Sequence, residues 1–245
     1  MIRVRRPTAV AVLTADTRTK LAARQTAASA FRRGDPRTEP AWKNFRRTKA
    51  GRATLAALEA VFRGKCAFCE RVGARTIDHY DPKERSPRRM YRWANLLLCC
   101  ADCNHAKGAA FPLRDRRPDL LDPTRDEPLD HYAWDLQTGA MGLVTDAARA
   151  HRGHTTREQL RLDEGPLRDE RRAQLERVLY LLAEVVNQNP IPAETATRLA
   201  DELSERRPYL GILRFVFLRP TRFTPLIDAA RQKLPEIDTW VRPWL

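Results

Sequence analysis

Two C-x-x-C motifs constrain this chain more than any other feature of its sequence. Cys66 and Cys69 form the first motif, and Cys100 and Cys103 form the second. Two thiolates on a tight turn can occupy two corners of a zinc tetrahedron, so two such motifs complete a four-cysteine site. Charged or polar residues flank both pairs, which is not typical of buried thiols that act as small hydrophobic groups. The spacing therefore predicts a structural Zn²⁺ ion held by all four cysteines.

The number of cysteines and the N-terminal sequence indicate the cell compartment in which the protein is found. The chain has five cysteines, and its basic N-terminus lacks the apolar stretch and small-residue cleavage site of a secretory signal. No apolar run approaches the ~20 residues of a membrane span. We therefore expect a cytoplasmic protein without a membrane segment, whose thiols bind metal rather than form disulfides. Cys99 lies one residue too far from Cys103 for a tight motif, and we expect it in the core with Leu96, Leu97 and Leu98.

The segment between the two motifs is longer than a zinc site alone needs. Thirty residues separate Cys69 from Cys100, whereas ordinary zinc ribbons have about 15 to 20. The segment contains the pairs Asp78-His79 and Asn95-Leu96, together with β-prone pieces and turn signals. The residues from Asn104 onward can start a short helix. We interpret this region as a hairpin followed by a helix.

In this order the motifs resemble the HNH endonuclease family, whose ββα-metal site reads C-x-x-C, then D-H, then N-L, then C-x-x-C-N-x-x-K. This chain has every element, in order, and ends the pattern at Asn104 and Lys107. Further similarity extends to the HNH subunit of the Septu anti-phage system, also found with some retrons, over roughly residues 1 to 185. That wider match is carried by Cys66–Glu70, Asp78–Lys83, Tyr91–Leu97, Leu121–Pro123 and the pattern Thr156-x-x-x-Leu160-x-Leu162.

The family resemblance implies roles for four catalytic residues. His79 would be the general base, because an imidazole has an unperturbed pKa near 6.5. The Asp78 carboxylate and the Asn104 amide oxygen would bind a catalytic Mg²⁺ or Mn²⁺ ion, which prefers such hard ligands. Asn95 would hold the loop that carries His79. The nine-residue step from Asn95 favours Asn104 over His105 as the third position of the motif.

The sequence indicates the residues that contact phosphate less clearly than it indicates the four catalytic residues. Lys107, His105 and Lys83 are candidates because they lie near the start of a short helix or beside the catalytic pair. The Arg-rich stretches 84–92 and 112–117 are consistent equally with solvated surfaces and with tracks for phosphates. The aromatic residues of the motif region fit core filling better than base stacking. These are Phe68, Tyr91 and Trp93.

Charge and motif together suggest the partners. Lys and Arg number 45 against 31 Asp and Glu, a formal net charge of +14 that favours a polyanion such as nucleic acid. A bias in genome composition is the alternative explanation for the charge alone. The leading interpretation is a DNA nuclease, with a partner ATPase of the defence complex implied by the Septu resemblance. The alternatives are an HNH nuclease acting on RNA, for instance tRNA, and a non-catalytic zinc-stabilised nucleic-acid-binding adaptor.

The pattern predicts an α+β chain that is mainly α-helical, with a small ββα-metal (HNH) centre and its four-cysteine zinc clip between helical segments. We divide it into an N-terminal segment 1–62, an HNH core 63–150 and a C-terminal helical region 151–245. Loops and short helices are expected before residue 50, and a helix that ends near Gly64 follows. An apolar stripe from Leu175 to Val186 predicts a helix that Asn189-Pro190 ends. Further helices are expected at about 193–206, 208–218 and 224–234.

Overall fold

The computed structural model describes residues 1–244, which divide into two compact units. The first, here called the cysteine unit, comprises Arg3–Asp126 with Gln159–Arg161. The second, the helical unit, comprises Met1–Ile2, Glu127–Glu158 and the residues from Leu162 onward. About half of the residues are helical, and the strands among residues 1–244 form three two-stranded sheets. The chain is therefore α+β and mainly helical, as predicted.

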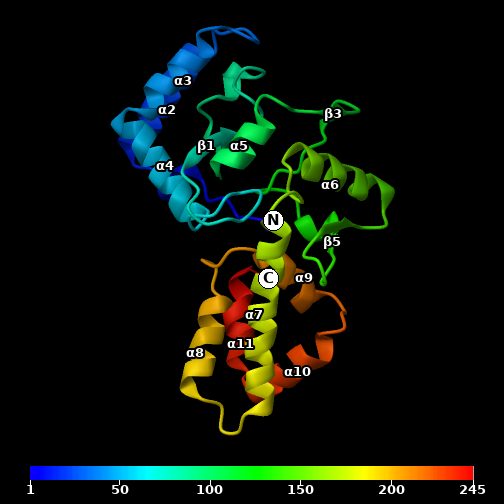
Figure 1. The fold of residues 1–245 in the computed structure, drawn as a ribbon. Coiled ribbons are helices and arrows are strands. Elements are labelled where there is room, and N and C mark those ends of the chain that lie inside the picture. The colour runs from blue at the N-terminus through cyan, green and yellow to red at the C-terminus, as the bar shows by residue number, and fades with distance from the viewer. Residues whose placement is uncertain (245) are drawn as a thin grey trace. The chain divides into compact units, whose positions relative to one another are not determined.

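Four helices open the cysteine unit: α1 (Ala9–Val12), α2 (Ala15–Ala28), α3 (Thr38–Arg46) and α4 (Lys49–Val61). The Thr14 and Thr48 hydroxyls cap α2 and α4 by accepting backbone N–H groups, which a helix N-terminus leaves unsatisfied. Helix α4 contacts α2, α3 and strand β2, and these helices lie along one side of the strands (Figure 1). The helix predicted before Gly64 is confirmed, whereas α2 is longer than the short helices expected before residue 50.

The hairpin predicted between the two cysteine motifs is present, but the helix expected to start at Asn104 begins at Ala101, inside the second motif, so Lys107 lies at its end and not near its start. Strand β1 (Thr76–His79) pairs antiparallel with β2 (Leu96–Cys99), in a register that places Thr76 opposite Cys99 and His79 opposite Leu96. The 3-10 helices η1 (Pro87–Arg89) and η2 (Trp93–Asn95) lie in the connection, and α5 (Ala101–Lys107) follows β2 and packs on β1. All four β2 residues are fully buried, which explains a continuous apolar run instead of alternation. A second hairpin, β3 (Leu113–Arg114) and β4 (Arg117–Pro118), follows α5.

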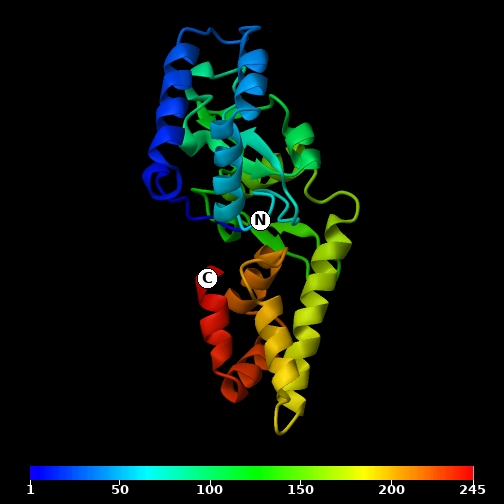
Figure 2. The same cartoon turned by 90° about the vertical axis from the view of Figure 1, so that its left-hand side faces the viewer.

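After residue 126 the helical unit contains η3 (Pro128–Asp130) and a hairpin of β5 (Tyr132–Trp134) and β6 (Met141–Leu143). Helix α6 (Ala147–Gln159) follows, and all later elements are helices. Helix α7 (Leu167–Asn187) packs against α8 (Ala193–Glu202), α9 (Leu210–Leu218) and α10 (Thr224–Lys233), as Figure 2 shows for α7 and α8. Helix α11 (Glu236–Val241) and η4 (Arg242–Trp244) complete the part that the structure describes. The predicted helices α7 to α10 are confirmed, and α11 is an addition to them. No helix within residues 1–244 combines the length and the apolar composition that crossing a membrane needs.

Candidate active site and cysteine cluster

The four cysteines of the two motifs come together in the cysteine unit. Their Sγ atoms all lie within 4.8 Å of one another, and those of Cys69 and Cys100 are 3.7 Å apart. A tetrahedral zinc ion about 2.3 Å from each sulfur requires sulfur–sulfur separations of roughly 3.8 Å. The cluster therefore has the composition and the dimensions of a zinc site.

Backbone contacts explain why the two motifs meet. The first motif is a tight turn, closed by the Cys66 N–H donating to Arg71 O at 2.8 Å, and Ala67 N donates to Leu98 O of β2 at 2.9 Å. In the second motif Cys100 is the N-cap of α5, and its sulfur accepts the Cys103 N–H at 3.4 Å. Hydrogen bonds among the thiols shift their pKa values in opposite directions: Cys103 lowers the pKa of Cys100, and Cys100 raises those of Cys69 and Cys103.

The fifth cysteine lies outside this set. Cys99 is fully buried beside Leu96, Leu97 and Leu98, as predicted. Its Sγ lies 3.7 Å from that of Cys66. Cys99 therefore packs against the cluster without belonging to the four cysteines that could hold a metal ion together.

A pocket of about 260 Å³ next to the hairpin is lined by several of the predicted catalytic residues. Asp78 and His79 come from the end of β1, and Asn104 comes from the facing side of α5. Because α5 packs on β1, Asn104 comes next to Asp78 and His79, which precede it by 26 and 25 positions in the sequence. The other lining residues are Glu39, Trp42, Arg46, Ile77, Pro82, Lys83, Glu84, Gly108 and Ala109.

The imidazole of His79 has a defined protonation pattern. Its Nε2 lies 2.9 Å from the Met90 carbonyl oxygen. Because a carbonyl can only accept, Nε2 carries the proton and Nδ1 keeps its lone pair in the neutral ring. Trp42 of α3 packs edge-on against the ring, with centroids 4.3 Å apart. Burial, assisted by the positive charge of Lys83, lowers the pKa of His79 to about 3, so the ring is neutral at physiological pH.

Asp78 is buried in an ion pair with Lys107. The Lys107 Nζ lies 3.1 Å from each carboxylate oxygen and donates a hydrogen bond to Oδ1, and it also donates to the His79 carbonyl at 2.6 Å. Oδ2 of Asp78 is buried and accepts no hydrogen bond, so its contact with Lys107 is an ion pair only. Burial raises the pKa of Asp78 to about 6, although the charge of Lys107 opposes that rise. The ammonium of Lys107, expected on phosphate from the sequence, thus lies in the interior.

Asn104 is oriented by a relay of hydrogen bonds. The Thr76 hydroxyl donates to Cys99 O at 2.7 Å, so its oxygen can only accept from Asn104, whose Nδ2 lies 3.1 Å away. This assigns the amide nitrogen to the strand side and leaves the Asn104 Oδ1 as the acceptor on the pocket side. The amide oxygen is therefore the group of Asn104 that can bind a cation.

Asn95 is fully buried and outside the pocket lining. Its Oδ1 accepts the Asp81 N–H, while its Nδ2 donates to the carbonyls of Asp81 and Arg89, at 2.9, 2.9 and 3.2 Å. One amide side chain thus closes the loop between β1 and η1, and the next residue after Arg89 supplies the carbonyl that holds His79. Asn95 therefore holds the loop that carries the Met90 carbonyl.

Helix α3 supplies pocket residues that sequence reasoning missed. Glu39, Trp42 and Arg46 line the pocket, yet no spacing relates them to the motif. Lys83, a predicted phosphate contact, lines the pocket too and pairs with Glu39 at 3.1 Å and Glu84 at 2.5 Å. His105 is exposed on α5 and outside the lining. The sequence predicted only loops and short helices before residue 50, so it gave no signal that assigned α3 to the pocket.

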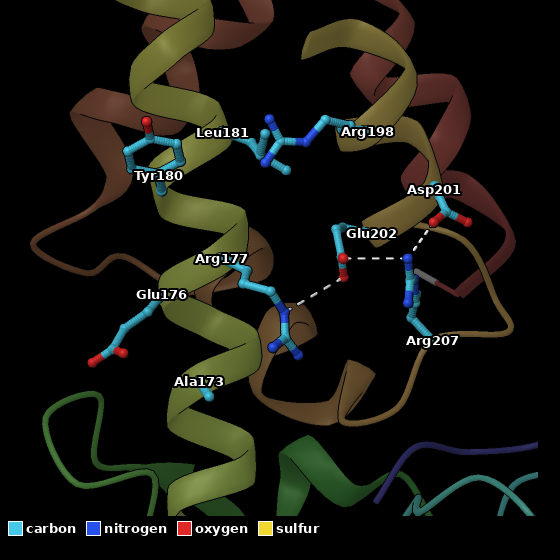
Figure 3. Close-up of a pocket in the computed structure, with 9 residues that line it drawn as sticks. All are labelled: Ala173, Glu176, Arg177, Tyr180, Leu181, Arg198, Asp201, Glu202 and Arg207. Atoms are coloured by element: carbon cyan, nitrogen blue, oxygen red, sulfur yellow. Dashed lines mark hydrogen bonds and ion pairs between the residues drawn. The ribbon is translucent and has the colours of Figure 1, made fainter. Parts of the chain in front are cut away.

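A larger hollow of about 550 Å³ lies in the helical unit between α7 and α8 (Figure 3). Arg207 of this hollow pairs with Asp201 and, at 3.3 Å, with Glu202, and Arg177 lies 3.9 Å from the Glu202 carboxylate. These charges neutralise one another across the groove. The hollow therefore lacks the combination of base and hard oxygen ligands found beside β1.

Comparison with known proteins gives one informative similarity. No protein-family model matches the chain. A stretch of 82 residues is 33% identical to the Septu protein PtuB of Bacillus thuringiensis, covering 31% of this chain and 30% of that protein. The match thus spans less than a third of the relative's length.

Proposed function

We propose that this protein is an HNH-type endonuclease that hydrolyses phosphodiester bonds in nucleic acid, with DNA the favoured substrate. The observation that carries the proposal is the pocket at the end of β1, where a neutral histidine, a buried carboxylate and an amide oxygen come together. A strand pair, a helix and a four-cysteine cluster hold these groups. This combination agrees with the family whose motifs the sequence resembles.

The residues of the pocket fit a divalent cation. Asp78 Oδ2 is buried and accepts no hydrogen bond, although the Lys107 ammonium lies 3.1 Å away, and a carboxylate that already pairs with one cation keeps further lone pairs for a metal ion. Together with Asn104 Oδ1 this carboxylate gives the hard, sparse oxygen set that Mg²⁺ or Mn²⁺ prefers. When bound, the cation would stabilise the negative charge that develops on the phosphate and the leaving oxygen.

Each of these side chains has a role in the proposed hydrolysis. His79 Nδ1 accepts a proton from water as the water oxygen forms its bond to phosphorus and the bond from phosphorus to the leaving oxygen breaks. Met90 O holds the ring by its Nε2 proton, and Asn95 holds the loop that carries Met90. Lys107 keeps Asp78 in place, and Arg46 is the exposed cation of the lining that can meet phosphate.

The likeness to a Septu protein leads to a proposal for the biological setting. We infer a nuclease effector of an anti-phage defence system, acting in a complex with a partner ATPase, because the matched relative bears the Septu name and the sequence motifs resemble its HNH subunit. Control by a partner would protect the host from its own nuclease. The exposed Tyr180 beside the charged groove of α7 and α8 marks a surface where such a partner could bind.

The decisive experiment compares the wild type with two matched histidine variants. Purified protein is incubated with supercoiled plasmid and with total RNA, with and without Mg²⁺ or Mn²⁺. His79→Ala should lose at least about 100-fold in cleavage rate, the order of contribution of a general base. His154→Ala, the same change at an exposed position of α6, should cleave like the wild type.

Each outcome of this comparison discriminates between functions. Equal cleavage by His79→Ala and the wild type would remove the proposed base. Cleavage of RNA in preference to plasmid would make the protein an RNA nuclease. Absence of cleavage by the wild type, with and without the partner ATPase and with zinc retained, would favour the non-catalytic adaptor.

A further inference from the structure

The β3–β4 hairpin carries positive charge that the rest of the fold leaves unneutralised. All six residues from Leu113 to Pro118 are exposed, and Figure 1 shows the ribbon at β3 standing out from the cysteine unit. Three of the six are arginines. Among the described residues, no carboxylate lies within ion-pair distance of Arg114, Arg116 or Arg117. In the other Arg-rich stretch, 84–92, Arg85 and Arg89 pair with the buried Asp81 at 2.9 and 3.1 Å, whereas Arg88 and Arg92 are exposed.

The hairpin is also costly to form in isolation. The register places Arg114 directly opposite Arg117, and like charges facing each other across two strands are destabilising. Its two turn residues, Asp115 and Arg116, have φ values of 49° and 64°, a left-handed backbone that non-glycine residues adopt at a cost. Two left-handed residues are also what a two-residue hairpin turn requires, so the charge repulsion is the cost that needs a further explanation. A polyanionic ligand would remove the charge repulsion.

The residues that flank the hairpin contact Tyr80, which follows the pocket residue His79. Asp119 N donates to Pro112 O at 3.0 Å, and Phe111 packs edge-on against Tyr80, with ring centroids 5.3 Å apart. The Tyr80 hydroxyl donates to Leu120 O at 2.7 Å, so both ends of the hairpin rest on the residue that follows His79. Ala109 lines the pocket and Leu113 is four residues later, a separation of at most about 14 Å.

We propose that the β3–β4 hairpin enters a groove of duplex DNA, where its three arginines contact phosphates, and thereby holds the duplex next to the pocket of Asp78 and His79. The statement about the pocket rests on the proposed nuclease function, whereas the statement about binding does not. The major groove of B-DNA, about 12 Å wide, admits a two-stranded ribbon. The deep, narrow major groove of A-form RNA does not admit side chains. Geometry therefore favours DNA over duplex RNA.

The test measures binding separately from cleavage. The full chain carrying His79→Ala serves as the parent, and fluorescence anisotropy follows a labelled duplex DNA of about 20 base pairs without added divalent cations. The hairpin variant adds R114Q, R116Q and R117Q. The control variant adds R198Q, R219Q and R222Q, three exposed arginines of the helical unit, so both variants lose the same charge.

We expect the hairpin variant to bind duplex DNA at least about tenfold more weakly than the control. The slope of log K against log salt concentration should fall by roughly 2 to 3, because each phosphate contact contributes about 0.9. Asp115→Asn should instead strengthen binding about two- to threefold, because it removes the only negative charge of the hairpin while asparagine tolerates the left-handed backbone. Duplex RNA of the same sequence should bind more weakly and respond little to the hairpin variant.

Three results would overturn the proposal: a parent that does not bind duplex DNA, equal affinity and salt slope in the hairpin and control variants, or an equal loss for RNA and DNA. Competition by polyglutamate as strong as by unlabelled duplex would identify an acidic polypeptide as the ligand instead. Plasmid cleavage by the protein with His79 intact is scored separately. If the hairpin variant loses DNA binding as expected but the protein with His79 intact cleaves no plasmid, only the proposed nuclease function is rejected. If the plasmid is cleaved but the hairpin variant binds DNA as well as the control variant, only the proposed role of the hairpin is rejected.

Discussion

Individual buried polar residues determine the geometry of the pocket, and they differ in how far the sequence could predict them. The loop-holding role that the HNH resemblance implies for Asn95 agrees with its three hydrogen bonds, whereas an Asn-Leu pair by itself predicts no such role. Lys107 was harder to place. A lysine near the end of a short helix normally points to solvent, and only the buried Asp78 makes an interior ammonium favourable. That partnership is a tertiary contact that no local pattern encodes.

Replacing Asn95 by aspartate should destabilise the cysteine unit by about 2 to 4 kcal/mol. An ionised carboxylate cannot donate to the Asp81 and Arg89 carbonyls, and each buried group left without a partner costs about 1 to 3 kcal/mol. Urea unfolding followed by tryptophan fluorescence measures the change. Asn44→Asp, the same substitution at an exposed position of α3, should shift the midpoint very little. Similar midpoints for the two variants would mean that the loop between β1 and η1 does not depend on Asn95.

Among whole elements, those with strong periodicity or motif spacing were predictable. Helices α7 to α10 and the sequence β1, β2, α5 agree with their patterns, because apolar stripes and turn residues act locally. Helix α2 buries only Thr17, Leu21 and Ala28, so its apolar stripe was too weak to predict its length. Helix α3 could be expected only as a short helix near Trp42, and its position over the pocket depends on how closely it packs against α4.

That close packing requires Gly51. A Cβ atom at this position would lie 2.2 Å from the Phe45 carbonyl oxygen at the end of α3, so an alanine would force the two helices apart. Overpacking of this kind typically costs about 1 to 3 kcal/mol. We therefore expect Gly51→Ala to lower the Tm and, by displacing Trp42 from His79, to reduce plasmid cleavage. Ala56→Ser, at an exposed position of the same helix, is the control, and a Gly51→Ala protein as stable and active as that control would contradict the role of the contact.

At the scale of the whole molecule, the two units have separate cores and differ in what stabilises them. The helical unit buries apolar faces of α7 and α9, whereas the cysteine unit packs its first helices on short strands beside the cysteine cluster. Apparent zinc-binding free energies of about 10 to 16 kcal/mol in small zinc domains equal or exceed the whole stability of a typical domain, about 5 to 15 kcal/mol. A single metal ion can therefore decide whether one unit folds while leaving the other unaffected.

Removal of zinc should consequently unfold one unit only. After chelation, or in Cys69→Ser, hydrogen exchange should accelerate in peptides from residues 66 to 107, while peptides from α7 and α8 keep the protection of the untreated protein. Cys99→Ser is the matched control, because Cys99 lies against the cluster but is not one of the four motif cysteines. Metal analysis should find one zinc ion per chain in Cys99→Ser and none in Cys69→Ser. Unchanged protection of residues 66 to 107 in zinc-free protein would show that the apolar contacts of β2 suffice without the metal. Loss of protection throughout the chain would instead show that folding of the helical unit depends on the cysteine unit.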